Sequence, residues 1–222
     1  MKKLILSAIF AVCTLATTMA QVDEGHVKFN LDVTATDPQM EMAVGMMQGS
    51  SVEIYFSGES IHSEVNMGAV MKVQTIVLGE TGEALILMSG MMGNTAVPTT
   101  TEAMEAESVE APELDIQLVD ETKEILGYEC KKAIVTDEDG NETITWYSED
   151  IKVNTKGQSY HNEKIPGFPL EFTQSANGMA MAFTATEIET KIDKKKKKTM
   201  FSVEIPEGYK EMTPEELKSM GI

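Results

Sequence analysis

The side chain with the most reactive chemistry in this sequence is Cys130, in the stretch EILGYECKKAIVTDEDGNETITWYSEDI. A catalytic thiol needs a neighbouring base that stabilises its thiolate. The histidines of the chain, His26, His62 and His161, form no recognisable motif with Cys130. Free cysteine is also among the most frequently buried residue types. We therefore interpret Cys130 as a buried structural residue of a strand, and we expect no catalytic residue and no enzyme activity.

The surroundings of Cys130 depend on the hairpin loop that follows it. A two-residue loop at Asp139-Gly140 would place Cys130 on one face with Tyr128, Ile134 and Tyr147. One extra loop residue would place it with Trp146 instead, because side chains alternate between the two faces of a strand. Both registers remain open from the sequence.

The same turn, DEDGNE, has the composition of a calcium loop. An EF-hand loop needs glycine at its sixth position and glutamate at its twelfth. Counted from Asp137, glycine comes fourth at Gly140 and the twelfth residue is Ser148. The spacing indicates a hairpin turn with solvated carboxylates, and we expect no metal and no cofactor.

Methionine is unusually frequent, with 17 residues in the chain. Thioethers bind Cu(I), so the pairs Met40/Met42 and Met179/Met181 raise a copper alternative. Flexible, polarisable methionine also suits the lining of a cavity or groove for apolar ligands. We prefer that interpretation, with these candidate lining residues: Met40, Met42, Met46, Met47, Met179, Met181, Phe168, Phe172 and Phe183.

Five consecutive lysines, Lys194 to Lys198, form the one strongly basic run of an acidic chain. We expect them in a solvated hairpin loop. Near an anionic lipid surface each lysine would contribute about 1 kcal/mol of attraction. The acidic remainder would oppose that attraction beyond a Debye length of about 8 Å.

Alternating apolar residues dominate the sequence after Gly25, which predicts strands. The segments 70–78 and 84–88 carry apolar residues on both faces and form a predicted hairpin. In PLEFTQSANGMAMAFTATEI, the dipeptide Asn177-Gly178 predicts a tight hairpin that pairs Ala176 with Met179. That register places the large apolar side chains on one face, namely Leu170, Phe172, Met181, Phe183 and Ala185. We expect about ten or eleven strands, with Phe201, Val203 and Ile205 in the last.

Two segments break the β pattern. Asp37 and Pro38 predict the start of a short Met-rich helix or lid, and Thr213 with Glu216 predicts a capped C-terminal helix. Residues 93–113 are rich in Thr, Ala, Glu and Pro, without a period, and predict a flexible excursion. The fold class is therefore mainly β: a curved antiparallel sheet with a short Met-rich helix or lid and a short C-terminal helix.

The N-terminus, MKKLILSAIFAVCTLATTMAQ, has the pattern of a secretory signal peptide cleaved after Ala20. Lipidation of Cys13 is the alternative, although bulky Val12 precedes it. The expected organisation is a signal peptide at 1–20 and a single domain at 21–222.

The formal net charge of −18 argues against nucleic acid as a partner. With no apolar run of spanning length in the mature chain, we expect no transmembrane span.

The stretch TKEILGYECKKA, with TWYSEDI and IPGFPLEF, resembles exported GLPGLI-type proteins and the family called domain of unknown function 4412. The stretches VEIYFSGESIHSEVNMG and FSVEIPEGYKEM are similar to the latter family. The chain has IPGFPLE at 165–171 in place of the GLPGLI motif. The resemblance implies export to the envelope and a strand pattern similar to the LolA/LolB-like lipoprotein carriers, where a curved sheet holds an acyl chain.

These observations predict a periplasmic or outer-membrane-associated protein. We expect it to act as a non-catalytic carrier or binder of an apolar or lipid ligand, such as an acyl chain or a lipoprotein lipid. The alternatives are an adaptor with a packed sheet that binds another envelope protein, and the Cu(I) binder described above.

Overall fold

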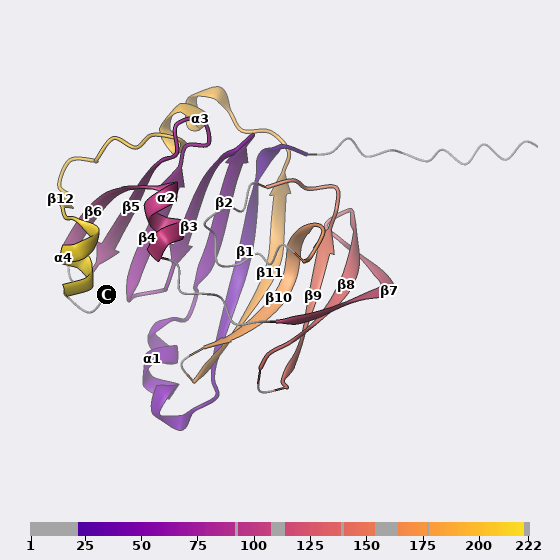
Figure 1. The fold of residues 1–222 in the computed structure, drawn as a ribbon. Helices are drawn as coiled ribbons and strands as arrows, with labels where there is room; N and C mark the ends of the chain where they lie inside the picture. Colours follow the sequence, from indigo (N-terminus) through magenta and orange to yellow (C-terminus); the bar gives the residue numbers. More distant parts are fainter. Residues whose placement is uncertain are drawn as a thin grey trace, which may run out of the picture.

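The computed structural model describes residues 22–91, 93–107, 114–138, 140–153, 164–176 and 178–219. These residues form one sheet of 12 strands in the order β12-β6-β5-β4-β3-β2-β1-β11-β10-β9-β8-β7 (Figure 1). The predicted signal peptide and Cys13 lie outside the described residues, as does His161.

The strands are β1 (Glu24–Ala35), β2 (Ser51–Ser57), β3 (Ser60–Asn66), β4 (Met71–Val77), β5 (Glu83–Gly90), β6 (Gly93–Thr100), β7 (Asp115–Ile125), β8 (Tyr128–Thr136), β9 (Glu142–Ser148), β10 (Phe168–Ala176), β11 (Met179–Glu189) and β12 (Lys210–Glu211). The helices are α1 (Glu41–Met46), α2 (Thr101–Glu107), α3 (Lys194–Met200) and α4 (Pro214–Ser219), with a 3-10 turn η1 (Pro38–Met40) before α1.

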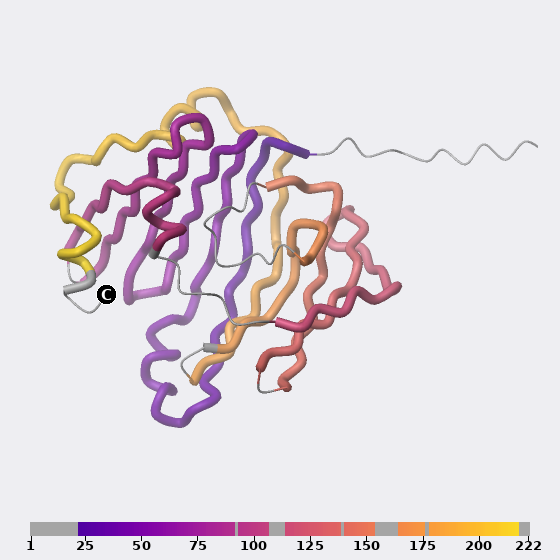
Figure 2. The backbone as a smooth tube through the Cα atoms, viewed as in Figure 1, coloured from indigo at the N-terminus to yellow at the C-terminus, as the bar shows by residue number. Residues whose placement is uncertain are grey.

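The predicted fold class is confirmed: the protein is mainly β, with one open, curved sheet and short helices (Figure 1). The strand pairs between β1 and β11 are antiparallel, while β12 pairs with β6 in parallel, so the sheet is mixed. Figure 2 shows how β1, near the N-terminus, runs beside β11, which lies far along the sequence. This long-range pair joins the two halves of the sheet.

The β10–β11 hairpin has the register that Asn177-Gly178 predicts. Ala176 pairs with Met179, and Phe172 pairs with Phe183. The two phenyl rings stack with centroids 4.5 Å apart. The predicted hairpin of residues 70–78 with 84–88 is also confirmed, because β4 pairs with β5 from Val77 to Met71.

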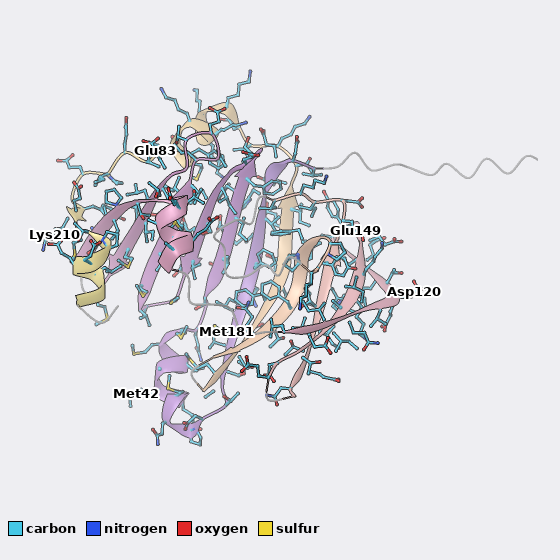
Figure 3. The ribbon with its side chains drawn as sticks, viewed as in Figure 1. Met42, Glu83, Asp120, Glu149, Met181 and Lys210 are labelled. Carbon is cyan, nitrogen blue, oxygen red and sulfur yellow. The ribbon has the colours of Figure 1, made fainter. Side chains whose placement is uncertain are left out.

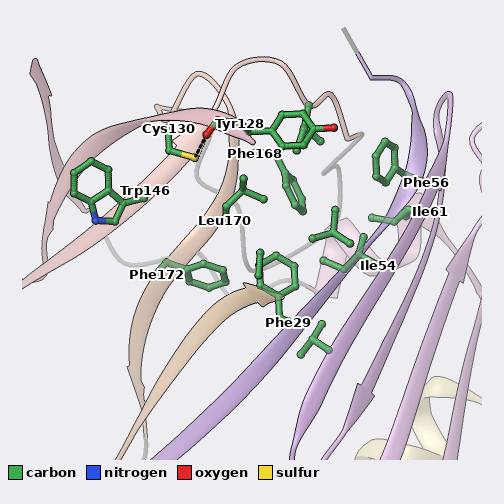
Figure 4. Packing of buried hydrophobic residues seen from close by; sticks show 14 of the residues in the cluster. Phe29, Ile54, Phe56, Ile61, Tyr128, Cys130, Trp146, Phe168, Leu170 and Phe172 are labelled. Atoms are coloured by element: carbon green, nitrogen blue, oxygen red, sulfur yellow. Dashed lines mark hydrogen bonds between the residues drawn. The ribbon is translucent and has the colours of Figure 1, made fainter. Parts of the chain in front are cut away.

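The main hydrophobic cluster fills the concave face of the sheet (Figure 4). It joins residues from both halves, with Phe56 and Ile61 on β2 and β3 and Cys130 and Trp146 on β8 and β9. From α2, Met104 packs against the same cluster. The largest buried side chains include Phe29, Phe56, Ile61, Leu85, Ile151 and Leu170.

The outer face carries a second cluster of Ile76, Leu85, Leu87 and Ala96. Val203, Ile205 and Tyr209 pack against it from the C-terminal segment. The prediction of a last strand through Phe201, Val203 and Ile205 is therefore wrong, since Phe201 is the C-cap of α3 and Val203 and Ile205 pack on the outer face outside any strand. Burial of alternating side chains produced the strand-like pattern.

Two further predictions need correction. Residues 93–107 of the predicted flexible excursion form β6 and α2, and Ala96 and Val97 are buried. Threonine and valine favour strands, and this segment completes the sheet beside β5. Lys194 to Lys198 form α3 rather than a hairpin loop, because Asp193 caps the helix by accepting hydrogen bonds from the amides of Lys195 and Lys196.

Both predicted helix starts are present. The Asp37 carboxylate accepts a hydrogen bond from the Gln39 amide at 2.9 Å, with Pro38 opening η1. Thr213 and Glu216 exchange backbone-to-side-chain hydrogen bonds of 2.8 and 3.2 Å at the start of α4. That reciprocal arrangement is the predicted capping box.

Candidate functional site

The concave face has a border of apolar side chains that the buried cluster does not cover. Val65 on β3 lies opposite Val73 on β4, which lies opposite Met88 on β5, and each is half-buried. Directly opposed residues of antiparallel strands point to the same face, and Val65 is also opposite the buried Val52. We call eight of the half-buried or exposed apolar residues of this face the apolar border: Val33, Val65, Val73, Ile86, Met88, Ile144, Met181 and Phe183.

The Met-rich segment lies at the end of the sheet where this border is found (Figure 1). The Ala69 amide, in the β3–β4 turn, donates to the Met46 carbonyl at 3.1 Å. The Thr36 and Asp37 amides donate to the Gly178 carbonyl in the β10–β11 turn. These bonds fasten η1 and α1 to the strand ends that carry Val65 and Met181.

Several methionines at this end of the sheet remain open to solvent. Met42 is 82 % exposed and Met46 is 46 % exposed; Figure 3 shows Met42 on α1 and Met181 on the sheet above it. Met91, in the β5–β6 turn, is 83 % exposed. These exposed thioethers and the half-buried apolar border lie at the same end of the sheet.

The predicted lining residues divide into three groups. Phe168 and Phe172 are buried in the main cluster, where each ring packs against Phe29 with centroids 6.2 Å apart. Met181 and Phe183 belong to the apolar border, and Met179 is half-buried at the start of β11. The third group lies outside the sheet, in η1, α1 and the residue that follows: Met40, Met42, Met46 and Met47.

Sequence reasoning did not single out Val65, Val73 or Ile144. The alternation in 70–78 placed Val73 in a predicted strand, but only strand pairing shows that Val65 and Val73 both face the main cluster. Ile144 pairs with Ile134 across β9 and β8 and is 46 % exposed. A signal for these residues would have required the register of each hairpin.

Cys130 is fully buried, and its thiol donates to the Tyr128 carbonyl at 3.6 Å. Burial raises the pKa of Cys130 to about 11, with Lys123 opposing the shift. The loop after β8 is longer than two residues, because Thr136 pairs with Glu142. Lys132 consequently pairs with Trp146, and Cys130 shares its cluster with Trp146, as in the second predicted register.

The turn DEDGNE is held by its own aspartate. The carboxylate of Asp137 accepts hydrogen bonds from the backbone amide of Asn141 at 2.8 Å and from its side-chain amide at 2.9 Å. Among the described residues, no group of three or more His, Cys, Asp and Glu side chains is arranged to hold a metal ion.

His26 and His62 lie on the outer face of the sheet, away from Cys130. The His26 ring stacks on Tyr55 with centroids 4.2 Å apart, and its Nε2 lies 3.1 Å from Glu53. Burial lowers the pKa of His62, whereas burial together with the hydrogen bond to Glu53 raises the pKa of Tyr55. Burial also works to raise the pKa of Glu53, but the hydrogen bond from Tyr55 and nearby His26 and Lys28 outweigh it, so the pKa is lowered.

A cavity of about 460 Å³ lies beside the turns that join β2 to β3 and β4 to β5. Its walls come from the turns around Glu59 and Gly79–Gly82 and from the start of α2. Its lining is mostly polar, with threonines and glutamates, in contrast to the apolar border. Within the part of the chain that the structure describes, no helix has the length and apolar character needed to cross a membrane.

The site and fold together define a protein with one curved sheet whose concave face is lined by apolar side chains. The model of the family described as N-glycanase peptide, N-terminal domain, matches residues 69–212, which is more than half of the chain. The chain therefore belongs to this family. No curated protein matches the sequence.

Among solved structures, PNGF-II in space group P21 is similar, with 14% identity and a TM-score of 0.47 over 88% of this chain and 33% of that one. PNGF-II in space group C2 gives 13% identity and a TM-score of 0.47 over 89% and 32%. A LolA superfamily protein from Nitrosomonas europaea gives 8% identity and a TM-score of 0.24 over 82% and 90%. The chain spans about a third of the length of PNGF-II.

Proposed function

We propose that this protein is a non-catalytic binding protein that holds an apolar ligand, such as an acyl chain, on the concave face of its sheet. The observation that carries the proposal is the apolar border beside the exposed methionines of α1. A sheet face packed for stability alone would bury such side chains, because exposed apolar surface contributes little to folding.

The geometry of the border fits an extended apolar ligand. Met88, Val73 and Val65 lie on adjacent strands, which are spaced about 4.8 Å apart. Met181 and Phe183 continue the apolar surface on the other half of the sheet. Methionine adapts to ligands of variable shape, since its unbranched side chain has three rotatable bonds.

The described reactive groups favour binding over catalysis. Cys130 is buried with a raised pKa, which keeps its thiol protonated near neutral pH. His26 and His62 are buried on the face opposite the apolar border. The kinship with a domain that forms part of a longer N-glycanase is also consistent with an accessory binding role.

We further propose, from the signal-peptide pattern, that the protein acts outside the cytoplasm, in the periplasm or at the outer membrane. The resemblance to the exported GLPGLI-type and domain of unknown function 4412 proteins belongs to the same proposal. Fractionation with intact-mass measurement tests it. A mature chain that begins at Gln21 is expected, and a diacylated Cys13 would contradict cleavage after Ala20.

The ligand proposal is tested by binding of the neutral dye N-phenyl-1-naphthylamine and by native mass spectrometry of protein from its own envelope. The variants Met88→Glu and Met181→Glu place a carboxylate on the border and are expected to weaken dye binding by roughly tenfold or more. The matched control is Leu118→Glu, on the edge strand β7, where leucine is 50 % exposed. This control is expected to bind the dye as the unmodified protein does.

Different outcomes separate the alternatives. Co-purifying lipid supports the carrier. The Cu(I) alternative would be supported instead by a bound copper ion that is lost in one of two double variants. These variants are Met40→Leu with Met42→Leu, and Met179→Leu with Met181→Leu. The adaptor alternative would be supported instead if the protein carried no lipid, bound no dye and was cross-linked to one envelope protein.

A further inference from the structure

The helix α3 carries a concentration of positive charge on a strongly acidic protein. Five of the 18 basic residues occupy the consecutive positions 194–198, while the chain has a formal net charge of −18. Lysines so close together repel one another, and a like-charge pair one turn apart destabilises a helix. The helix nevertheless forms, with a capping aspartate and direct contacts to the sheet.

Two of these lysines hold the helix on the sheet. Lys197 forms an ion pair with Glu24 of β1, and this bond lowers the pKa of Glu24. The ammonium group of Lys196 lies 4.6 Å from the ring centroid of Tyr55 on β2, within range of a cation–π contact. These contacts orient α3 as a fixed element.

The other three lysines face away from these contacts. Each helical residue advances by about 100°, so Lys194, Lys198 and Lys195 span an arc of about 100° on the side opposite Lys196 and Lys197. All three are exposed, and no described residue forms an ion pair with them. The helix α3, held in place on the sheet, therefore presents three ammonium groups on its exposed side.

We propose that this face of α3 is a docking surface for an anionic phospholipid membrane. The exposed turn holds lysines and Thr199 and offers no large apolar side chain. Protein interfaces generally need an apolar core as an anchor, whereas a lipid surface binds clustered lysines by charge alone. The acidic remainder of the protein is screened beyond about 8 Å at physiological salt, so docking acts at contact range.

The docking surface and the apolar border lie at opposite ends of the sheet. Figure 1 shows α3 above the upper strand ends and α1 below the lower ones. A protein docked through α3 would thus keep α1 and the border directed away from the bilayer. The docking proposal is independent of ligand binding, and either can fail without the other.

The test is co-sedimentation of the full chain with vesicles of equal parts phosphatidylglycerol and phosphatidylcholine, compared with pure phosphatidylcholine. The variant carries Lys194→Gln, Lys195→Gln and Lys198→Gln together. Each lysine near the surface contributes roughly a fivefold increase in partitioning, so the triple variant is expected to lose on the order of 100-fold. Binding should also weaken steeply as salt rises.

A matched control changes the net charge equally at other exposed or partly exposed places, with Lys131→Gln, Lys152→Gln and Lys210→Gln. It is expected to retain nearly all vesicle binding, and circular dichroism should show both triple variants folded. Equal losses in the two variants, or no binding of the unmodified chain to anionic vesicles, would overturn the proposal. Binding of a short DNA duplex as tightly as the vesicles would overturn the assignment to lipid.

Discussion

Leu170 provides a sharp test of the concave core, because a matched leucine exists elsewhere in the same sheet. Leu170 on β10 is fully buried in the main cluster, whereas Leu118 on β7 is 50 % exposed. Substitution of each by alanine removes the same atoms. The two variants differ only in what surrounded the lost atoms.

The expected costs follow from burial. A fully buried leucine loses both transfer free energy and contacts around the resulting cavity, so Leu170→Ala should lower the free energy of unfolding by about 3–5 kcal/mol. Leu118→Ala leaves no enclosed cavity and loses about half of the transfer free energy, or roughly 1 kcal/mol. With a urea m-value of about 2 kcal/mol/M, the midpoint should fall by roughly 2 M for Leu170→Ala and by about 0.5 M for Leu118→Ala.

Urea unfolding can be followed by intrinsic fluorescence, because the chain has one tryptophan, Trp146, and it lies in the same cluster as Leu170. Circular dichroism provides a second probe of the same transition. Equal midpoint shifts for the two variants would refute the conclusion that the concave face around Leu170 is a packed core.

Three further predictions concern single residues. Burial lowers the pKa of His62 below 6.5, so the folded state binds fewer protons than the unfolded state and its stability should fall as the pH drops below 6.5. The fall should be shallower in His62→Gln, by at most about 1.4 kcal/mol per pH unit, in urea titrations at several pH values. Cys130 should react with a thiol reagent at neutral pH only after urea unfolding, and rapid reaction of the native protein would contradict its burial. Cys130→Ala should lower the free energy of unfolding by on the order of 1 kcal/mol without loss of ligand binding. Gly178→Ala should lower the melting temperature more than Gly127→Ala does. Both glycines have positive φ, but only a Cβ added at 178 would lie close to another residue, 2.9 Å from the Asp37 Cβ. Equal decreases would show that Asp37 can move away without a cost in stability.

Short-range features of the fold could be predicted because neighbouring residues determine them. The β10–β11 register follows from the Asn177-Gly178 turn, which requires a backbone conformation that glycine and asparagine readily adopt. The caps at Asp37 and Thr213 involve bonds to residues two or three positions away. The same kind of signal was present at Asp193, whose position before the lysine run allows a helix to start.

Features that depend on long-range pairing could not be derived in this way. Phe201, Val203 and Ile205 alternate like a strand, but β6 pairs with β12 instead, and the segment covers the outer face. Cys130 acquired its neighbours from the length of a loop, which the composition of DEDGNE leaves open. Local sequence preferences cannot decide between such arrangements, because each satisfies alternation equally well.

The candidate site shows the same division. The sequence by itself determined which residue types are available for an apolar surface, and two of the residues it named, Met181 and Phe183, are half-buried on the concave face. Only the tertiary structure decided that Phe168 and Phe172 are buried while Met42 is exposed. The physical reason is that exposure depends on how the whole sheet curves and on what packs over each face, and both are set by contacts between residues far apart in the chain.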